Sequence, residues 1–244
     1  MDVDAAKKKD KINRGRCAIK MNTTKTTLEF LEKLEKYGKE LGILNIGYLN
    51  DLKKHQIKKN TGKDFNNAII LTMEMDQRIL EEGPSDKAKE YNYQLYEHFK
   101  NITYKINNYI ENEGFQTIVA IPNSDLIDFT KLGEAAGLGT IGNNGLLISP
   151  EHGPKQKISA ILVKIENLPE REYKYQWIKE HCKDCKECVK NCPEDALIEK
   201  QDHVILDSDK CIGSKQGCGE CIKSCPIYNK GYIETLKEYK KGII

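Results

Sequence analysis

The 244-residue sequence predicts an α/β domain followed by a small metal-binding module. Helical and strand patterns alternate through about the first two thirds of the chain, which is typical of a layered α/β architecture. Eight of the nine cysteines then fall between positions 182 and 225. We therefore expect a flexible arm at 1–22, an α/β core domain at 23–170 and a cysteine-rich domain at 171–244.

The first 22 residues are basic and poor in apolar side chains, which predicts a solvated arm. A nucleic-acid-binding arm is the alternative, but no aromatic residues are interleaved with its charges. Cys17 has no cysteine or histidine neighbour with which to share a metal, so we expect it to bind none.

The core domain begins with a predicted helix from Thr26 to Leu41. Thr26-x-x-Glu29 has the form of a capping box, and Gly42 stands where a helix C-terminal glycine belongs. The apolar runs 44–49 and 68–73 then predict two strands of a covered sheet.

The longest predicted helix runs from Ser85 to Glu113 and ends before Gly114. Residues 115–121 and 157–165 predict a third and a fourth strand. Together these segments predict the α/β layering.

The composition excludes several classes of function. Lys and Arg number 39 and Asp and Glu number 37, a net charge of +2, which gives no global attraction to nucleic acid or to an anionic membrane. No apolar run approaches the ~20 residues that span a bilayer, and no secretory signal is present. Because cysteines that bind a metal must stay reduced, we expect a cytoplasmic protein.

The cysteines form two runs with related spacing. They read Cys182-x2-Cys185-x2-Cys188-x3-Cys192-Pro193 and Cys211-x6-Cys218-x2-Cys221-x3-Cys225-Pro226. In ferredoxins with two 4Fe–4S clusters, the fourth cysteine of each run binds the other cluster. The pattern therefore predicts one ligand set of Cys182, Cys185, Cys188 and Cys225, and another of Cys192, Cys211, Cys218 and Cys221.

The spacing before Cys218 departs from the simplest pattern, because six residues rather than two separate it from Cys211. Zinc and disulfides are the alternative uses of paired cysteines. The two tandem Cys-Pro endings argue against both, since each proline stops the turn just past a ligand.

A glycine-rich segment, 133–153, separates the third and fourth predicted strands. Its glycines would let the backbone approach a ligand closely, or simply permit tight chain reversals. Gly137-x-Gly139-x-x-Gly142 has dinucleotide-binding spacing, but a helix rather than a strand precedes it. The pattern alone leaves both uses open.

This segment also carries a family resemblance. From Ala136 to Gly153 it reads AGLGTIGNNGLLISPEHG, and a strand and the double cysteine motif follow. Over about residues 25 to 230 the chain resembles the epoxyqueuosine reductases and their relatives, the reductive dehalogenases. The resemblance implies a nitroreductase-like, cobalamin-binding core and a ferredoxin-like domain that feeds electrons to a corrinoid. It places these residues against the cofactor: Gly137, Leu138, Gly139, Thr140, Gly142, Asn143 and Asn144.

The chain departs from the family pattern at several positions. Thr140 and Asn143 stand where the family has Trp and Lys, and Asn123 stands at the acidic proton donor, with Asp125 two positions on. An amide cannot donate a proton as a carboxylic acid does, so Asp125 or a tyrosine supplies it, or the chemistry is absent. Asp125 would otherwise cap a helix beginning near Leu126.

Two functions follow as hypotheses. In the first, a reductase takes electrons from a donor such as a ferredoxin or flavodoxin, and passes them through two 4Fe–4S clusters to a corrinoid that reduces a small substrate. In the second, the chain has no organic cofactor and docks another redox protein, for instance to activate it reductively. A structural role for the clusters is a third reading. Because the chain ends at Ile244 without the helical repeats of epoxyqueuosine reductases, we do not expect tRNA as substrate.

Overall fold

The core of the protein is a four-stranded antiparallel sheet. The computed structural model describes residues 24–55, 65–120, 127–172, 174–201 and 203–242. The strand order is β1-β2-β6-β3, and every neighbouring pair is antiparallel. The strands are β1 (Asn45–Leu49), β2 (Asn67–Glu74), β6 (Gln156–Val163) and β3 (Thr117–Ala120). All four predicted strands are confirmed, and the fold is a mixed α/β arrangement.

Helices cover both faces of this sheet, which explains why its central strands read as continuous apolar runs. On β2, Ile69 and Leu71 belong to the core shared with α2 (Leu28–Glu40) and α4 (Asp86–Asn112). Ile70, between them, belongs to a second core shared with α5 (Phe129–Ala135). The alternation follows from the two-residue period of a strand.

Side-chain caps fix where these helices begin. The oxygen of Thr27, not of Thr26, accepts from the Phe30 N–H at 3.2 Å, so the predicted cap of α2 was wrong by one residue. Ser85 caps α4 as predicted, accepting from the Ala88 N–H at 3.1 Å. Asp128 caps α5, which therefore begins at Phe129 and not near Leu126.

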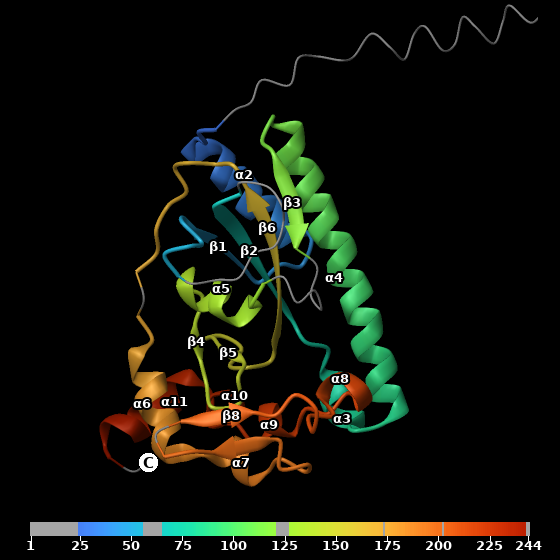
Figure 1. Ribbon diagram of the computed structural model, residues 1–244, viewed down its shortest axis with the longest axis vertical. Helices are drawn as coiled ribbons and strands as arrows, with labels where there is room; N and C mark the ends of the chain where they lie inside the picture. Colours follow the sequence, from blue (N-terminus) through green and yellow to red (C-terminus); the bar gives the residue numbers. More distant parts are fainter. Residues whose placement is uncertain (1–23, 56–64, 121–126, 173, 202, 243–244) are drawn as a thin grey trace, which may run out of the picture.

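The cysteine-rich residues form a second layer at one end of the sheet (Figure 1). The sequence predictions did not include its individual short elements. They are α6 (Gln176–Cys185), α7 (Glu187–Lys190), β7 (Leu197–Glu199), β8 (Val204–Leu206), α8 (Gly213–Gln216), α9 (Glu220–Lys223), α10 (Pro226–Asn229) and α11 (Tyr232–Lys240). Between this layer and the sheet lies a small hairpin of β4 (Thr140–Ile141) and β5 (Leu147–Ile148).

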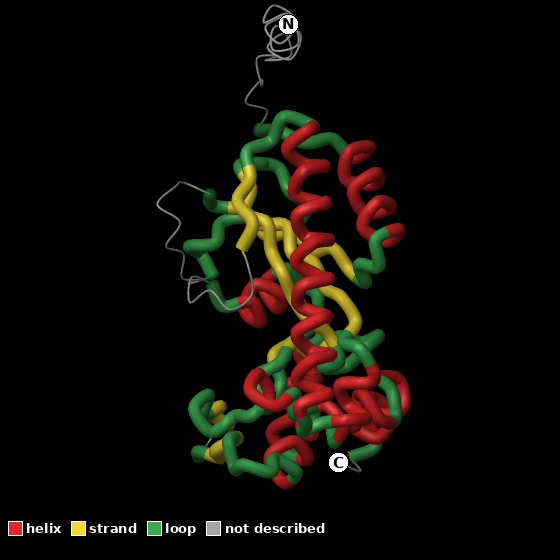
Figure 2. Tube along the Cα trace, turned by 90° about the vertical axis from the view of Figure 1, so that its right-hand side faces the viewer, coloured by secondary structure: helices red, strands yellow, loops and turns green. Residues whose placement is uncertain are grey.

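The helix α4 joins the two layers, because it runs from beside the sheet down to the cysteine-rich layer (Figure 2). Its N-terminus rests on the end of α8, where the N–H of the cap residue Ser85 donates to the Gln216 carbonyl at 3.0 Å. Gly217 has a φ of +68°, and a Cβ there would come within 2.5 Å of the Ala88 backbone. Glycine is needed here for both conformation and close approach.

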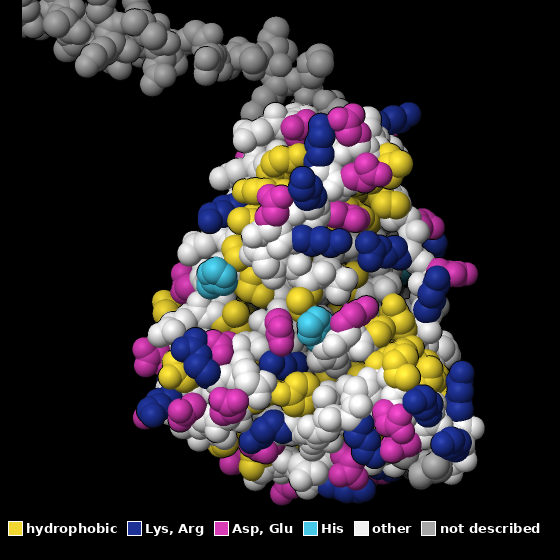
Figure 3. All heavy atoms as spheres, turned by 180° about the vertical axis from the view of Figure 1, so that it is seen from behind, with side chains coloured by type: hydrophobic (Ala, Val, Ile, Leu, Met, Phe, Trp, Pro, Cys, Tyr) yellow, Lys and Arg dark blue, Asp and Glu magenta, His cyan; other side chains and the backbone are white. Residues whose placement is uncertain are grey.

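The surface carries charges of both signs. On the face shown in Figure 3, Lys and Arg are interspersed with Asp and Glu, with no large area of one sign. Among the described helices, none combines the length and the apolar character required to cross a membrane.

Candidate functional site

Four cysteines, three from the first run and one from the second, line one small cavity. Cys182 and Cys185 lie on α6, Cys188 lies on α7, and Cys225 precedes α10. A thiolate at Cys182 would repel charges at each of the other three, which places all four within electrostatic reach. These are the residues of the first predicted ligand set.

The other four cysteines line a larger cavity of about 300 Å³. They are Cys192, Cys211, Cys218 and Cys221, the second predicted set. The wide spacing between Cys211 and Cys218 is explained by α8, a turn of helix that fills the interval and packs against α4. Cys211 therefore lies with its set in spite of the unusual spacing.

The two cavities are adjacent. Cys188 of the first set and Cys221 of the second are electrostatic neighbours, and Asn144 lines both cavities. Within the described residues, no three His, Cys, Asp or Glu side chains are arranged to hold a single metal ion.

Burial makes these thiols poor acids. It is the largest cause that raises the pKa of Cys182, Cys188 and Cys221, each to about 12, and neighbouring cysteine charges add to the effect. A desolvated thiolate needs nearby positive charge. Iron would supply that charge.

Most of the predicted cofactor loop serves internal packing. A Cβ at Gly139 would come within 2.3 Å of the Ile148 carbonyl oxygen, so glycine permits the contact between β4 and β5. Leu138 is 5% exposed and Thr140 is fully buried, with its hydroxyl donating to Glu134 at 2.8 Å. Gly137 and Gly142 likewise face protein atoms, of Arg171 and Ile148.

The last two residues of that loop reach the cysteines. The Asn143 Nδ2 donates to the carbonyl of Cys182, and the Asn144 Nδ2 donates to the carbonyl of Cys221 at 3.4 Å. Consecutive residues of the β4–β5 turn therefore hold one segment from each cysteine set. The sequence singled out both asparagines, but as contacts to a cofactor.

The larger cavity extends from the second cysteine set to the core domain. Its wall there includes Tyr96 and Asn92 of α4 and Lys157 of β6. The Lys157 ammonium donates to the Tyr96 hydroxyl at 3.3 Å and lies 4.6 Å from the centre of its ring. Asn92 is 6% exposed, and its Oδ1 has no hydrogen-bond partner among the described residues.

These three residues were missed by the sequence analysis. The helical periodicity of α4 predicted a face that packs on the sheet, and nothing local showed that the N-terminal third of the helix extends past the sheet. The apolar part of the cavity wall includes Met75, Leu146, Leu197, Leu206 and Ile222. An apolar wall with a few polar groups is typical of a small-molecule site.

The two predicted catalytic positions lie in the segment between β3 and α5. Asn123 and Asp125 lie outside the described residues, as does Cys17. The alternative call for Asp125, a helix cap, therefore also falls outside the described residues, and the cap of α5 is Asp128.

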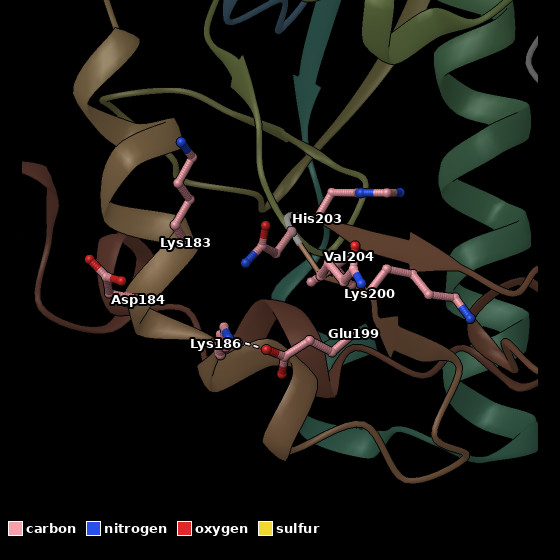
Figure 4. Close-up of a pocket in the computed structure, with 9 residues that line it drawn as sticks. Lys183, Asp184, Lys186, Glu199, Lys200, His203 and Val204 are labelled. Atoms are coloured by element: carbon pink, nitrogen blue, oxygen red, sulfur yellow. Dashed lines mark hydrogen bonds and ion pairs between the residues drawn. The ribbon is translucent and has the colours of Figure 1, made fainter.

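A third cavity, of about 360 Å³, lies beside α6 and the β7–β8 hairpin. In Figure 4 Lys186 and Glu199 point toward one another and form an ion pair, whereas Asp184 and Lys200 point to opposite sides. Its charged groups do not converge on one point, so we assign it no function.

Comparison with known proteins agrees with this geometry. Residues 175–198, which contain the first cysteine run, match the model of the family described as "4Fe-4S binding domain". A tetrachloroethene reductive dehalogenase of Desulfitobacterium hafniense is 27% identical over 158 residues, 65% of this chain and 28% of that protein. An epoxyqueuosine reductase of Staphylococcus aureus is 30% identical over 125 residues, 51% of this chain and 28% of that protein.

Solved structures share the fold. A catabolic reductive dehalogenase superposes with a TM-score of 0.69 at 17% identity, over 86% of this chain and 33% of its own. The epoxyqueuosine reductase of Streptococcus thermophilus superposes with a TM-score of 0.58 at 21% identity, over 84% of this chain and 67% of its own. The predicted resemblance to these two groups of reductases is confirmed, although the chain spans 28% of the length of both curated relatives.

Proposed function

We propose that this homologue of reductive dehalogenases and epoxyqueuosine reductases is an iron–sulfur reductase with two 4Fe–4S clusters. Electrons from a low-potential donor protein, such as a ferredoxin or flavodoxin, enter at the first cysteine set and pass to the second. From there they reach an acceptor in the larger cavity. The observation that carries the proposal is the division of eight thiols between two adjacent cavities, one of which opens toward the core domain.

The donor chemistry of both cavities suits iron. Four thiols are the usual ligands of a 4Fe–4S cluster, and each iron of a cube takes one of them. The exchange of Cys192 and Cys225 between the two cysteine runs is the exchange found in two-cluster ferredoxins. The same thiols must stay reduced, which favours the cytoplasm.

A corrinoid is our candidate for the acceptor, and it would supply a strongly reducing metal centre. The unpartnered Oδ1 of buried Asn92 suits a group that donates a hydrogen bond, such as the peripheral amides of a corrinoid. Asn144 is the one residue of the predicted loop that also lines this cavity, beside Asn92, Tyr96 and Leu206. These four residues would hold an edge of the macrocycle.

Tyr96 is our candidate for proton delivery. Tyr96 lines the cavity, and the adjacent Lys157 ammonium would stabilise the phenolate that remains after the proton leaves. A tyrosine can therefore fill the role for which the chain has Asn123 in place of an acid.

The test is a metal count and a spectrum. Anaerobically purified protein should contain about eight irons per chain, and added cob(II)alamin should bind with a changed visible spectrum. Zinc in place of iron would overturn the cluster assignment. Full iron with no affinity for any cobalamin form would favour the alternative role, that of a redox partner without an organic cofactor.

A further inference from the structure

His181 is a buried histidine without a hydrogen-bond partner. It precedes Cys182 on α6 and is 2% exposed, and neither ring nitrogen is bonded to any described residue. Its ring packs near those of Trp177 and Tyr239, with centroids 6.0 and 6.3 Å away. Buried polar groups in proteins are nearly always satisfied, so an exception indicates a partner that the protein atoms do not supply.

The surroundings of His181 indicate where that partner lies. The residue lines the same cavity as the four cysteines of the first set. Other groups on this wall already have protein partners, since Asn143 donates to the Cys182 carbonyl and Lys186 pairs with Glu199. Ile148 and Ile227 have no polar side-chain atoms to offer. The occupant of the cavity is the remaining partner.

We propose that an N–H of His181 donates a hydrogen bond to a sulfur of the first cluster and thereby raises its reduction potential. The inference rests on the proposed function, since it requires iron bound by Cys182, Cys185, Cys188 and Cys225. Cluster and thiolate sulfurs accept hydrogen bonds, and an imidazole always carries at least one N–H. Reduction adds negative charge to the cluster, so a donor stabilises the reduced form more than the oxidised one.

The second cavity has no equivalent residue on its described wall, because no histidine lines it. A histidine donor is therefore available beside the first thiol set and not beside the second, although the two sets are alike. His181 would be a positioning residue, because it would act on the reduction potential of the first cluster and would not contact the substrate.

The experiment is an anaerobic redox titration of His181→Leu, followed by electron paramagnetic resonance. We expect the one-electron reduction constant of the first cluster to fall about tenfold, which is about 59 mV toward more negative potential. The second cluster should be unchanged. His181→Gln keeps an N–H donor and should restore part of the shift, and His203→Leu, at an exposed histidine nearby, should shift neither potential.

A spectroscopic measurement needs no substitution. Wild-type protein with nitrogen-15-labelled histidine should show a weak nitrogen hyperfine coupling to the reduced first cluster. Absence of this coupling, or an unchanged potential in His181→Leu with full iron, would overturn the inference and leave the proposed function standing. A strong coupling of the kind a directly bound nitrogen gives would overturn it by making His181 a ligand. Failure of the proposed function would appear earlier, as wild-type protein without iron.

Discussion

Two buried asparagines of α4 differ in what lies beside them. Asn92 and Asn107 are 6% and 7% exposed, and in each the Oδ1 has no partner among the described residues. Asn92 lines the larger cavity, whereas Asn107 is absent from the described walls of every cavity discussed above. The pair offers a test of whether an unpartnered amide serves a ligand.

Asn92→Leu should weaken cob(II)alamin binding by about tenfold, the usual worth of one hydrogen bond in a buried site. Asn107→Leu removes the same group elsewhere on the helix and should leave the affinity unchanged. Titration followed by visible absorption measures both. Equal affinities in the two variants and the wild type would remove Asn92 from the acceptor site.

Tyr96→Phe removes a hydroxyl and little else. If Tyr96 delivers the proton, the variant should catalyse the proposed reduction at least about 100-fold more slowly than wild type. Its iron content and cob(II)alamin affinity should stay the same, since the ring and Lys157 remain. Steady-state assays with a reduced viologen as electron source give the comparison, and an unaltered rate would exclude Tyr96 as donor.

The β4–β5 hairpin gives a structural reason for the glycines of this segment. Its glycines do permit a close approach, but the partner of Gly139 is the backbone of Ile148. Glu134 then ties the hairpin to α5, because it accepts from the Thr140 hydroxyl at 2.8 Å and the Ile141 N–H at 3.0 Å. Lys179 of α6 pairs with the same carboxylate at 2.8 Å.

Gly139→Ala should lower the unfolding free energy by about 1–3 kcal/mol, the usual cost of an overpacked site. The added Cβ would meet a carbonyl oxygen that cannot rotate away. Urea denaturation measures the loss. Gly231→Ala is no suitable control because its φ of +87° adds strain, whereas Gly213→Ala meets ordinary contacts of at least 3.4 Å and should cost less.

Glu134→Gln should lower the unfolding free energy by about 1–2 kcal/mol at pH 7, because charge-assisted hydrogen bonds are lost. Burial alone would raise the pKa of Glu134, but the bonds from Lys179, Ile141 and Thr140 lower it overall from 4.5. Because the pKa of Glu134 is lower in the folded protein than in the unfolded chain, its carboxylate stabilises the fold at pH values above the unfolded pKa. This stabilisation is lost as the pH falls through the folded pKa. The difference between wild type and variant should therefore shrink below pH 4.5. A difference that does not change with pH would show that the charge of Glu134 is unimportant.

Sequence patterns predicted the features that depend on spacing along the chain, but not those that depend on how distant segments pack together. Cysteine spacing predicted which four thiols line each cavity, because the spacing of two-cluster ferredoxins includes the exchange of the fourth cysteine. Periodicity predicted the four strands and α4. Neither could predict that Asn92, Tyr96 and Lys157 meet the second cysteine set, because they come from α4 and β6, far from it in sequence. The hydrogen-bonding state of His181 is likewise a property of packing.

Replacing one cysteine of each set tests the predicted division of the eight thiols between two clusters. Cys185→Ser and Cys221→Ser should each remove about half of the iron, because each belongs to a different set of four. Iron analysis and electron paramagnetic resonance should show which cluster remains. A loss of all iron in either variant would mean that the two clusters do not load independently.

Because Cys192 and Cys225 each line the cavity of the other run, neither cysteine run alone supplies a complete set of four thiols. Each cavity takes three thiols from one run and one from the other. A polypeptide severed between residues 192 and 211 would leave neither fragment with a complete set, so deleting either run would leave no set of four thiols. Reduction to a single cluster would require replacing ligands one at a time while the other run stays in place.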